Sequence, residues 1–305
     1  MVDTHTDVTA DAEPAHRSGF VAIIGRPNVG KSTLLNQLVG QKVAIVSPKP
    51  QTTRQRLLGV KTLPRAQVIF IDTPGLHAPR HLLGRRMVET AERAVGEADL
   101  LVWVVDVTAG LGTADRQIAQ RLREEGRRAC VVVNKIDRVV PLQLLPLLAT
   151  LDQLLPGRHV IPVSALHGAN LGELLDHIVR ALPAGPRYYD PDALTDQSER
   201  MLAQEVVREK VLLHTHREVP YAVVVTVEKF EEKGSLTVIG AAIHVERQSQ
   251  KGILIGQRGA RIKEIGRAAR LELEAMLGRR IYLELFVRVQ EGWSRREALL
   301  KEFGL

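Results

Sequence analysis

A glycine-rich loop near the N-terminus carries the residue types that bind phosphate groups. Gly25 and Gly30 are separated by four residues and precede Lys31 and Ser32, which matches the pattern G-x-x-x-x-G-K-[ST]. In such a loop the backbone N–H groups point at phosphate oxygens, the lysine reaches the β- and γ-phosphates, and the hydroxyl ligates Mg²⁺. The loop therefore predicts a nucleoside triphosphate site. Its expected members are Gly25, Arg26, Pro27, Asn28, Val29, Gly30, Lys31, Ser32 and Thr33.

A second motif, DTPG, supplies groups that a triphosphate site needs beside the loop. Asp72 ends an apolar run and is placed to hold Mg²⁺ through water. Thr73 and Pro74 follow, and the backbone N–H of Gly75 can meet the γ-phosphate. The glycine-rich loop alone fits ATPases, kinases and GTPases, so other residues must identify the base.

The motif NKID selects guanine. The Asp137 carboxylate can accept from guanine N1–H and from the 2-amino group, and adenine offers neither donor. Asn134 is expected to brace the base and the phosphate loop, and the stem of Lys135 to cover one face of the ring. In the later VSA motif, Ser164 and Ala165 follow a strand, and the Ala165 N–H is expected to meet guanine O6. These motifs, in this order, predict a GTP site.

The polar stretch SPKPQTTRQR is expected to be the switch segment that senses the γ-phosphate. Thr53 is the expected Mg²⁺ ligand in it; the alternatives are Thr52 and an unrelated polar turn. The expected catalytic residues are Lys31, Thr53 and Gly75. The expected Mg²⁺ ligands are Ser32, Thr53 and Asp72.

The motifs lie at the ends of apolar runs that alternate with helical patterns. The expected strands are FVAII, QVIFID, LLVWVV, CVVVNK and HVIPVS. The expected helices are TLLNQLVG, residues 81–95, ADRQIAQRLREEG, LLPLLATLDQLL and LGELLDHIVRAL. This alternation predicts an α/β domain over residues 18–183, with a mostly parallel sheet and helices on both faces. Ligands bind such sheets at the carboxyl ends of the strands, where the motifs stand.

The pattern changes after a linker at residues 184–197, which is rich in proline, glycine and aspartate. Residues 198–305 form the expected second domain. Its expected elements are a helix at 198–213, strands YAVVVTVEKF and SLTVIGAAIHV joined by the turn EEKG, a short helix before IGQRG, a helix from Ala260 to about Leu277, and the strand YLELFVRV. The order α-β-β-α-α-β describes an α+β domain.

The loop IGQRG is a second glycine motif with a different chemistry, because no GK[ST] follows it. A G-x-x-G loop between two helices can clamp the backbone of a single RNA strand. Between Arg247 and Arg280 there are nine lysines and arginines against three glutamates. A helix-turn-helix corner is the alternative, but the element order and the positive charge favour a KH-type RNA-binding domain. The expected RNA-binding residues are Gly256, Gln257, Arg258, Gly259, Arg261 and Lys263.

The two domains together resemble the Era family of bacterial ribosome-assembly GTPases. The resemblance covers nearly the whole chain after residue 17 and rests on the loop and switch motifs, SERMLAQEVVREK and GILIGQRGARIKEIG. It implies a P-loop GTPase domain followed by a type II KH domain. It also implies a GTP/GDP-binding, largely monomeric, cytoplasmic protein that binds the 3′ end of 16S ribosomal RNA, assists maturation of the 30S subunit, and associates peripherally with the inner membrane.

The resemblance also bears on hydrolysis. Leu76 stands where Ras-like enzymes carry the glutamine that orients water, and a leucine side chain cannot do this. In related GTPases with GxPNxGK[ST] loops, an asparagine such as Asn28 helps to bind K⁺, which takes the place of an arginine finger. The alternative is that Asn28 only stabilises the turn. Slow turnover leaves open a protein that holds GTP as a structural ligand. A second domain that docks on a protein or a membrane is the remaining alternative.

Composition is consistent with a globular chain in a reducing compartment. The 305 residues carry a formal charge of +7, and the one cysteine, Cys130, is expected in a buried strand. Residues 1–17 are polar and acidic and are expected to be a disordered tail rather than a signal peptide. Trp103 is expected in the core, and Trp293 is expected to pack rather than to stack on RNA. His214 and His216 do not share a helix face, so a metal site there is disfavoured.

Overall fold

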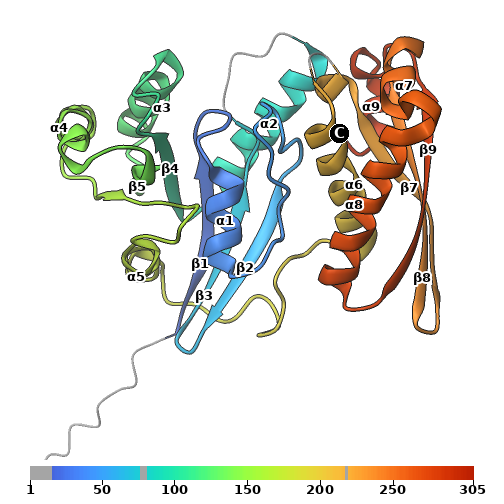
Figure 1. Ribbon diagram of the computed structural model, residues 1–305. Helices are drawn as coiled ribbons and strands as arrows, with labels where there is room; N and C mark the ends of the chain where they lie inside the picture. Colours follow the sequence, from blue (N-terminus) through green and yellow to red (C-terminus); the bar gives the residue numbers. More distant parts are fainter. Residues whose placement is uncertain (1–15, 76–80, 217–218) are drawn as a thin grey trace, which may run out of the picture.

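The computed structural model describes residues 16–75, 81–216 and 219–305 and contains two sheets, each with its own helices (Figure 1). The first sheet has six strands in the order β2-β3-β1-β4-β5-β6, and β2 is its only antiparallel member. The elements of this domain are β1 (Arg17–Ile24), α1 (Lys31–Val39), β2 (Leu57–Leu63), β3 (Ala66–Asp72), α2 (Leu82–Glu97), β4 (Leu100–Asp106), α3 (Thr113–Glu124), β5 (Ala129–Asn134), α4 (Leu145–Leu154), β6 (Val160–Pro162) and α5 (Leu171–Ala181).

Helices cover both faces of this sheet because successive residues of its strands point to opposite sides. In β1, Val21 and Ile23 join the core under α1 and α5, whereas Ala22 and Ile24 join the core under α2, α3 and α4. Every residue of β3 and β4 is buried, as expected for strands covered on both faces. The expected burial of Trp103 and Cys130 is confirmed.

The strand β2 is missing from the sequence-based prediction. It pairs antiparallel with β3 at the edge of the sheet, with Leu63 opposite Ala66 across a tight turn. Only its first four residues are buried, and the rest are partly exposed. A strand that is only half covered at a sheet edge lacks the continuous apolar run that marks the central strands.

The segment predicted as a linker lies along the first domain. Tyr188 and Tyr189 donate their backbone N–H groups to Gln67 Oε1 over 2.8 and 3.0 Å. The Leu194 carbonyl accepts from Val60 N over 2.8 Å. These bonds attach residues 184–197 to β2 and β3. The proline, glycine and aspartate content of the segment predicts its turns but not these contacts.

Two predictions concern residues at the limits of the described structure. Of the predicted tail, residues 1–15 lie outside the described residues, whereas Arg17 begins β1 and the ring of His16 lies 2.9 Å from the Gly185 carbonyl. The ordered domain therefore starts earlier than residue 18. Leu76 also lies outside the described residues, between Gly75 and residue 81.

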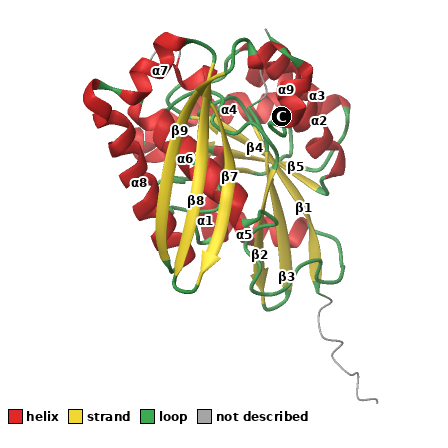
Figure 2. Cartoon of the chain, turned by 90° about the vertical axis from the view of Figure 1, so that its right-hand side faces the viewer, coloured by secondary structure: helices red, strands yellow, loops and turns green. Residues whose placement is uncertain are grey.

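The second domain has the predicted order α-β-β-α-α-β. Its elements are α6 (Glu199–His214), β7 (Val224–Lys233), β8 (Leu236–Val245), α7 (Gln248–Ile255), α8 (Ala260–Leu277), β9 (Arg280–Val289) and α9 (Glu297–Glu302). The helices α6 and α8 pack on one face of the sheet β7-β8-β9 (Figure 2), whereas Val224 on the other face packs against Leu300 of α9.

Two details of this domain differ from the prediction. The turn lies at Gly234 rather than across EEKG, because Glu231, Glu232 and Lys233 pair with β8. Alternating charged side chains on an exposed hairpin resemble a turn in sequence, but the ladder continues through them. The short helix α9 is an additional element that the sequence pattern does not signal.

An apolar cluster joins the two domains. Leu83 and Met87 of α2 pack with Trp293 and with Leu300 and Phe303 at the C-terminal end of the chain. Trp293 is fully buried and donates its indole N–H to the Ala222 carbonyl over 3.0 Å. The prediction that Trp293 packs rather than stacks on RNA is confirmed, and its place is the interdomain contact.

Candidate guanine nucleotide and RNA sites

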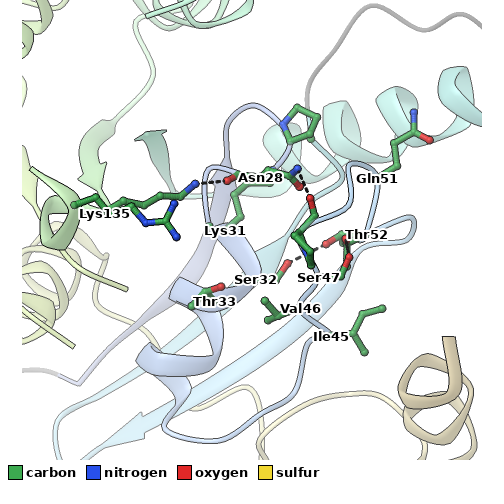
Figure 3. A pocket seen from close by; sticks show the side chains of 16 residues that line it. Asn28, Lys31, Ser32, Thr33, Ile45, Val46, Ser47, Gln51, Thr52 and Lys135 are labelled. Carbon is green, nitrogen blue, oxygen red and sulfur yellow. Dashed lines mark hydrogen bonds between the residues drawn. The ribbon is translucent and has the colours of Figure 1, made fainter. Parts of the chain in front are cut away.

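The predicted nucleotide residues converge at the carboxyl end of the parallel strands. The P-loop follows β1, Asp72 ends β3, Asn134 ends β5, and Ser164 follows β6. An open pocket of about 430 Å³ lies between the P-loop, the switch segment and Lys135 (Figure 3). The pocket is lined by Pro27, Asn28, Gly30, Lys31, Ser32, Thr33, Ile45, Val46, Ser47, Pro48, Gln51, Thr52, Thr53, Gly75, Lys135 and Arg138.

The loop conformation requires glycine at position 30. Gly30 has a φ of 101°, which residues with a side chain rarely adopt, and a Cβ here would lie 2.3 Å from Asn134 Nδ2. Asn134 in turn donates to the Val29 carbonyl over 2.8 Å. The phosphate loop and the base motif are therefore built against each other, and Asn134 braces the loop as the sequence predicts.

Lys31 is the buried cation of the pocket. Its side chain is 6% exposed, and Nζ donates to the carbonyls of Gly25 and Arg26 over 3.2 and 3.0 Å. Burial lowers the pKa of Lys31 to about 8, and the nearby Asp72 carboxylate only partly opposes this. The site thus holds a desolvated ammonium whose charge an incoming phosphate would stabilise.

Three oxygen groups converge beside Lys31. Ser32 Oγ donates to Asp72 Oδ2 over 2.7 Å, and Thr53 Oγ1 lies 3.0 Å from both oxygens. Asp72 is fully buried, and within the described part of the chain its Oδ1 has no hydrogen-bond partner. Burial raises the pKa of Asp72 despite Lys31 and these hydroxyls. A hard divalent cation would satisfy this oxygen set, so the residues fit Mg²⁺.

The structure distinguishes the two candidate threonines of the switch segment. Thr52 Oγ1 donates to the Lys49 carbonyl over 2.7 Å and lies 3.0 Å from Ser47 Oγ, inside its own turn. Thr53 alone of the pair reaches Ser32 and Asp72. The geometry supports the choice of Thr53.

The guanine motif is held by its own contacts. Ser164 Oγ donates to Asp137 Oδ1 over 2.5 Å, and this bond holds the pKa of Asp137 below its usual value. An ionised carboxylate is the acceptor that guanine needs. The Ala165 N–H, however, donates to Asn134 Oδ1 over 2.9 Å. This bond ties the VSA motif to the NKID motif, and the bond from Ala165 to guanine O6 stays a prediction.

Asp106 is a site residue that the sequence analysis missed. It ends β4, and its Oδ2 accepts from Lys135 Nζ over 2.5 Å, while Lys135 also donates to the Asn28 carbonyl over 2.8 Å. Burial opposes ionisation of Asp106, but the bonds from Lys135 and Thr108 outweigh it and lower its pKa. The sequence could have indicated Asp106 in one way: like Asp72 and Asn134, it is a polar residue at the end of an apolar strand.

The side chains of several other predicted nucleotide-site residues contact the protein itself. The Arg26 side chain forms an ion pair with Asp115 of α3 over 2.6 Å. Thr73 Oγ1 donates to the Ile23 carbonyl over 2.9 Å. The Asn28 amide donates to the Pro48 carbonyl over 2.9 Å, so it links the P-loop to the switch segment, and its predicted role toward K⁺ stays a prediction. Gly75 lies against Pro27, where a Cβ would approach the proline nitrogen to 2.7 Å.

The loop of the second domain presents backbone and positive charge to solvent. Gly256 has a φ of 71°, and a Cβ there would lie 2.8 Å from Arg261 Cβ. Gln257 and Arg258 are exposed at the tip, and Arg261 and Lys263 are exposed on the first turn of α8. Arg261 also donates to the Ile253 carbonyl over 3.0 Å. The loop has the shape and charge that a phosphodiester backbone would meet.

The fold and the site define a P-loop GTPase joined to a KH domain. Residues 20–135 match the family described as 50S ribosome-binding GTPase, and residues 218–294 match the KH domain family. The chain is 49% identical to GTPase Era of Heliobacterium modesticaldum, over 94% of this chain and 97% of that protein. It is 48% identical to GTPase Era of Geotalea daltonii, over 96% and 99%. The chain belongs to the Era family of GTPases.

Solved structures agree over both domains. A crystal structure of an Aquifex aeolicus Era variant bound to GDP and AlF4⁻ matches with a TM-score of 0.92 and 44% identity, over 94% of this chain and 99% of that one. A crystal structure of Era with MgGDPNP and nucleotides 1506–1542 of 16S ribosomal RNA matches equally well, over 95% and 99%. The predicted fold class and the predicted GTPase activity are thereby confirmed.

The pKa of Lys31 predicts a pH dependence of nucleotide binding. The triphosphate favours protonated Lys31, and in the free protein this proton is lost as pH rises through about 8. GTP affinity should therefore fall about tenfold between about pH 7 and about pH 9, in step with the protonated fraction. Calorimetry across this range measures it. Guanosine lacks phosphates, so its affinity reports any titration of the base alone. If the affinities of guanosine and GTP change equally with pH, the role of Lys31 is contradicted.

Proposed function

We propose that this GTPase uses its nucleotide state to control binding of the 3′ region of 16S ribosomal RNA, and that it assists assembly and maturation of the 30S subunit. The observation that carries the proposal is the pairing of a complete guanine nucleotide site with an exposed G-x-x-G loop in one chain. The Era structure solved with a 16S fragment supports it, because the alignment with that protein covers both domains.

The residues of the pocket would divide the work of hydrolysis. Lys31 and the loop amides would bind the β- and γ-phosphates, and the Gly75 N–H would hold the γ-phosphate where negative charge develops. Ser32 and Thr53, with Asp72 behind them, would hold Mg²⁺, which supplies positive charge to the phosphate oxygens. Water attacks the γ-phosphorus, the bond to the β-phosphate oxygen breaks, and GDP and phosphate leave. Asp137 would provide the preference for guanine.

The RNA site would work by close approach of backbone to backbone. At Gly259 a side chain would project into open space, so its absence leaves room for a phosphodiester beside the loop, and Arg258, Arg261 and Lys263 add positive charge. Base recognition would come from the neighbouring helix and strand.

A titration of the full chain tests this function. A single-stranded oligonucleotide with the 3′ sequence of 16S RNA is titrated into protein loaded with GDPNP or with GDP, and a scrambled oligonucleotide is the control. We expect tighter binding of the 3′ sequence in one nucleotide state, because a ligand couples to a state only through a difference in affinity. Equal affinity for both oligonucleotides, or for both nucleotide states, would contradict the proposal.

K⁺ is part of the proposed mechanism through Asn28. We expect hydrolysis at saturating Mg²⁺ to be faster in K⁺ than in Na⁺ by at least about tenfold, because a cation near the developing charge lowers the barrier. The measurement is phosphate release in the two chlorides, with Asn28→Ala as the variant that should lose the difference. Equal hydrolysis rates in the two salts would contradict a role for K⁺, and the bond of Asn28 to the Pro48 carbonyl would then be its assigned contact.

The remaining features implied by the family stay predictions. They are a monomeric state and peripheral association with the inner membrane. Within the described residues, no helix is both long and apolar enough to cross a membrane. Sedimentation with vesicles of anionic lipid would measure the membrane association directly.

A further inference from the structure

An arginine of the switch segment is buried in the KH domain. Arg54 lies one residue after Thr53, and only 5% of it is exposed. Its guanidinium donates to the carbonyls of Val223 over 2.6 Å, Tyr221 over 3.2 Å and Pro220 over 3.3 Å. All three carbonyls belong to the KH domain, in the segment just before β7.

The rest of the cage around Arg54 also comes from the KH domain. The guanidinium carbon lies 5.8 Å from the centre of the Trp293 ring, a distance at which a cation is attracted to the aromatic face. Burial, together with the nearby Arg208, lowers the pKa of Arg54 to about 9. A buried charge is costly unless its donors are satisfied. The two Nη atoms of Arg54 make the bonds to the KH-domain carbonyls, whereas its buried Nε has no partner among the described residues, so the position of Arg54 depends on the groups that the KH domain supplies to the Nη atoms.

The KH domain also holds the switch segment through two side chains of α6. Arg208 of α6, which is 2% exposed, donates to the Thr52 carbonyl. Glu209 accepts from the backbone N–H of Val46 over 2.7 Å. The KH domain therefore holds both neighbours of Thr53: it binds the backbone carbonyl of Thr52 and it buries the side chain of Arg54.

We propose that Arg54 is a positioning residue for GTP hydrolysis: its anchorage on the KH-domain carbonyls holds Thr53 beside Ser32 and Asp72, so that the hydrolytic site is complete only when the KH domain is seated. The inference rests on the proposed role of Thr53. A shift of about 1 Å in a group that positions the reaction can cost a factor of about 100 in rate. The contact gives the RNA-binding domain a direct mechanical connection to the Mg²⁺ side of the nucleotide site.

The test compares variants that keep the fold. Arg54→Met retains an apolar stem and removes every donor, which leaves the carbonyls of Pro220, Tyr221 and Val223 without this partner. Arg54→Lys keeps the charge but not the forked geometry. Arg86→Ala is the matched control for loss of an interdomain ion pair: Arg86, on α2, pairs with Glu297 over 2.7 Å, and it borders the same cavity as Arg54 without belonging to the switch segment. Thermal unfolding verifies that each variant folds.

We expect Arg54→Met to lower kcat for GTP at least about tenfold with little change in KM. The kcat of Arg54→Lys should lie between those of Arg54→Met and the parent, and the kcat of Arg86→Ala should equal that of the parent. Independently of activity, hydrogen exchange of residues 45–56 in the nucleotide-free protein should accelerate in Arg54→Met and stay unchanged in Arg86→Ala. An equal loss of kcat in Arg86→Ala, or a parent-like kcat in Arg54→Met, would overturn the inference.

Thr53→Ala separates this inference from the function on which it rests. If Thr53→Ala hydrolyses GTP like the parent, the proposed role of Thr53 fails together with the inference. If Thr53→Ala is inactive and Arg54→Met is not, the inference alone fails. No RNA is present in these assays, so their outcome does not depend on the proposed RNA binding.

Discussion

Asp137→Asn is expected to reduce GTP affinity by at least about 100-fold and to raise affinity for xanthosine triphosphate. The carboxylate is the acceptor for two guanine donors, and a site built for hydrogen bonds strongly rejects a partner that leaves them unpaired. The amide of asparagine presents a donor, which the 2-oxo group of xanthine can accept and the 2-amino group of guanine cannot. Competition of both nucleotides against a fluorescent GDP analogue measures the exchange of preference.

The bond from Ser164 sharpens this prediction. Ser164 orients Asp137 and keeps it ionised, so Ser164→Ala should weaken GTP by a smaller factor without improving binding of xanthosine triphosphate. Asp176→Asn, at an exposed position of α5, is the matched control and should leave both affinities unchanged. A GTP affinity of Asp137→Asn equal to that of the parent would refute the assignment of the base site.

The motifs could be predicted from sequence because each is local and each follows a strand. A parallel sheet brings the ends of its strands together, so the position of each motif after a strand was enough to place Lys31, Asp72 and Asn134 at one edge of the sheet, where Asp72 and Asn134 contact the P-loop. The same local character explains the success with the second domain, where the helix from Ala260 to Leu277 and the glycine loop are contiguous in sequence.

Contacts between distant segments could not be predicted in this way. In the sequence Arg54 resembles any other polar residue of a turn. In the structure it is buried, and its guanidinium binds carbonyls about 170 residues later in the chain. Asp106 belongs to no recognisable sequence motif, and it contributes to the site through its bond to Lys135. The edge strand β2 and the helix α9 are defined by their partners more than by their own periodicity, because tertiary packing outweighs local propensity there.

Replacement of Gln257 and Arg258 by aspartate is expected to weaken RNA binding at least about tenfold. The change removes one positive charge and adds two negative ones at the tip of the loop where phosphates should pass, and each lost phosphate contact also removes release of a counterion. Arg258 has a φ of 52°, a conformation that aspartate tolerates better than most residues, and both glycines remain. Both side chains are exposed, so the fold should persist.

A charge-matched control isolates the loop from the net charge of the chain. Gln120→Asp with Arg123→Asp makes the same change on the exposed face of α3 in the GTPase domain. GTP affinity should be unchanged in both double variants, because Lys31 and Asp137 lie in the other domain from the loop and away from α3. The measurement is a titration with the 16S 3′ oligonucleotide at several salt concentrations, where the loop variant should show a smaller salt dependence than the parent. If both variants bind the oligonucleotide as tightly as the parent, the G-x-x-G loop is not the RNA site; if both lose affinity equally, general electrostatic attraction explains the binding and the loop has no special part in it.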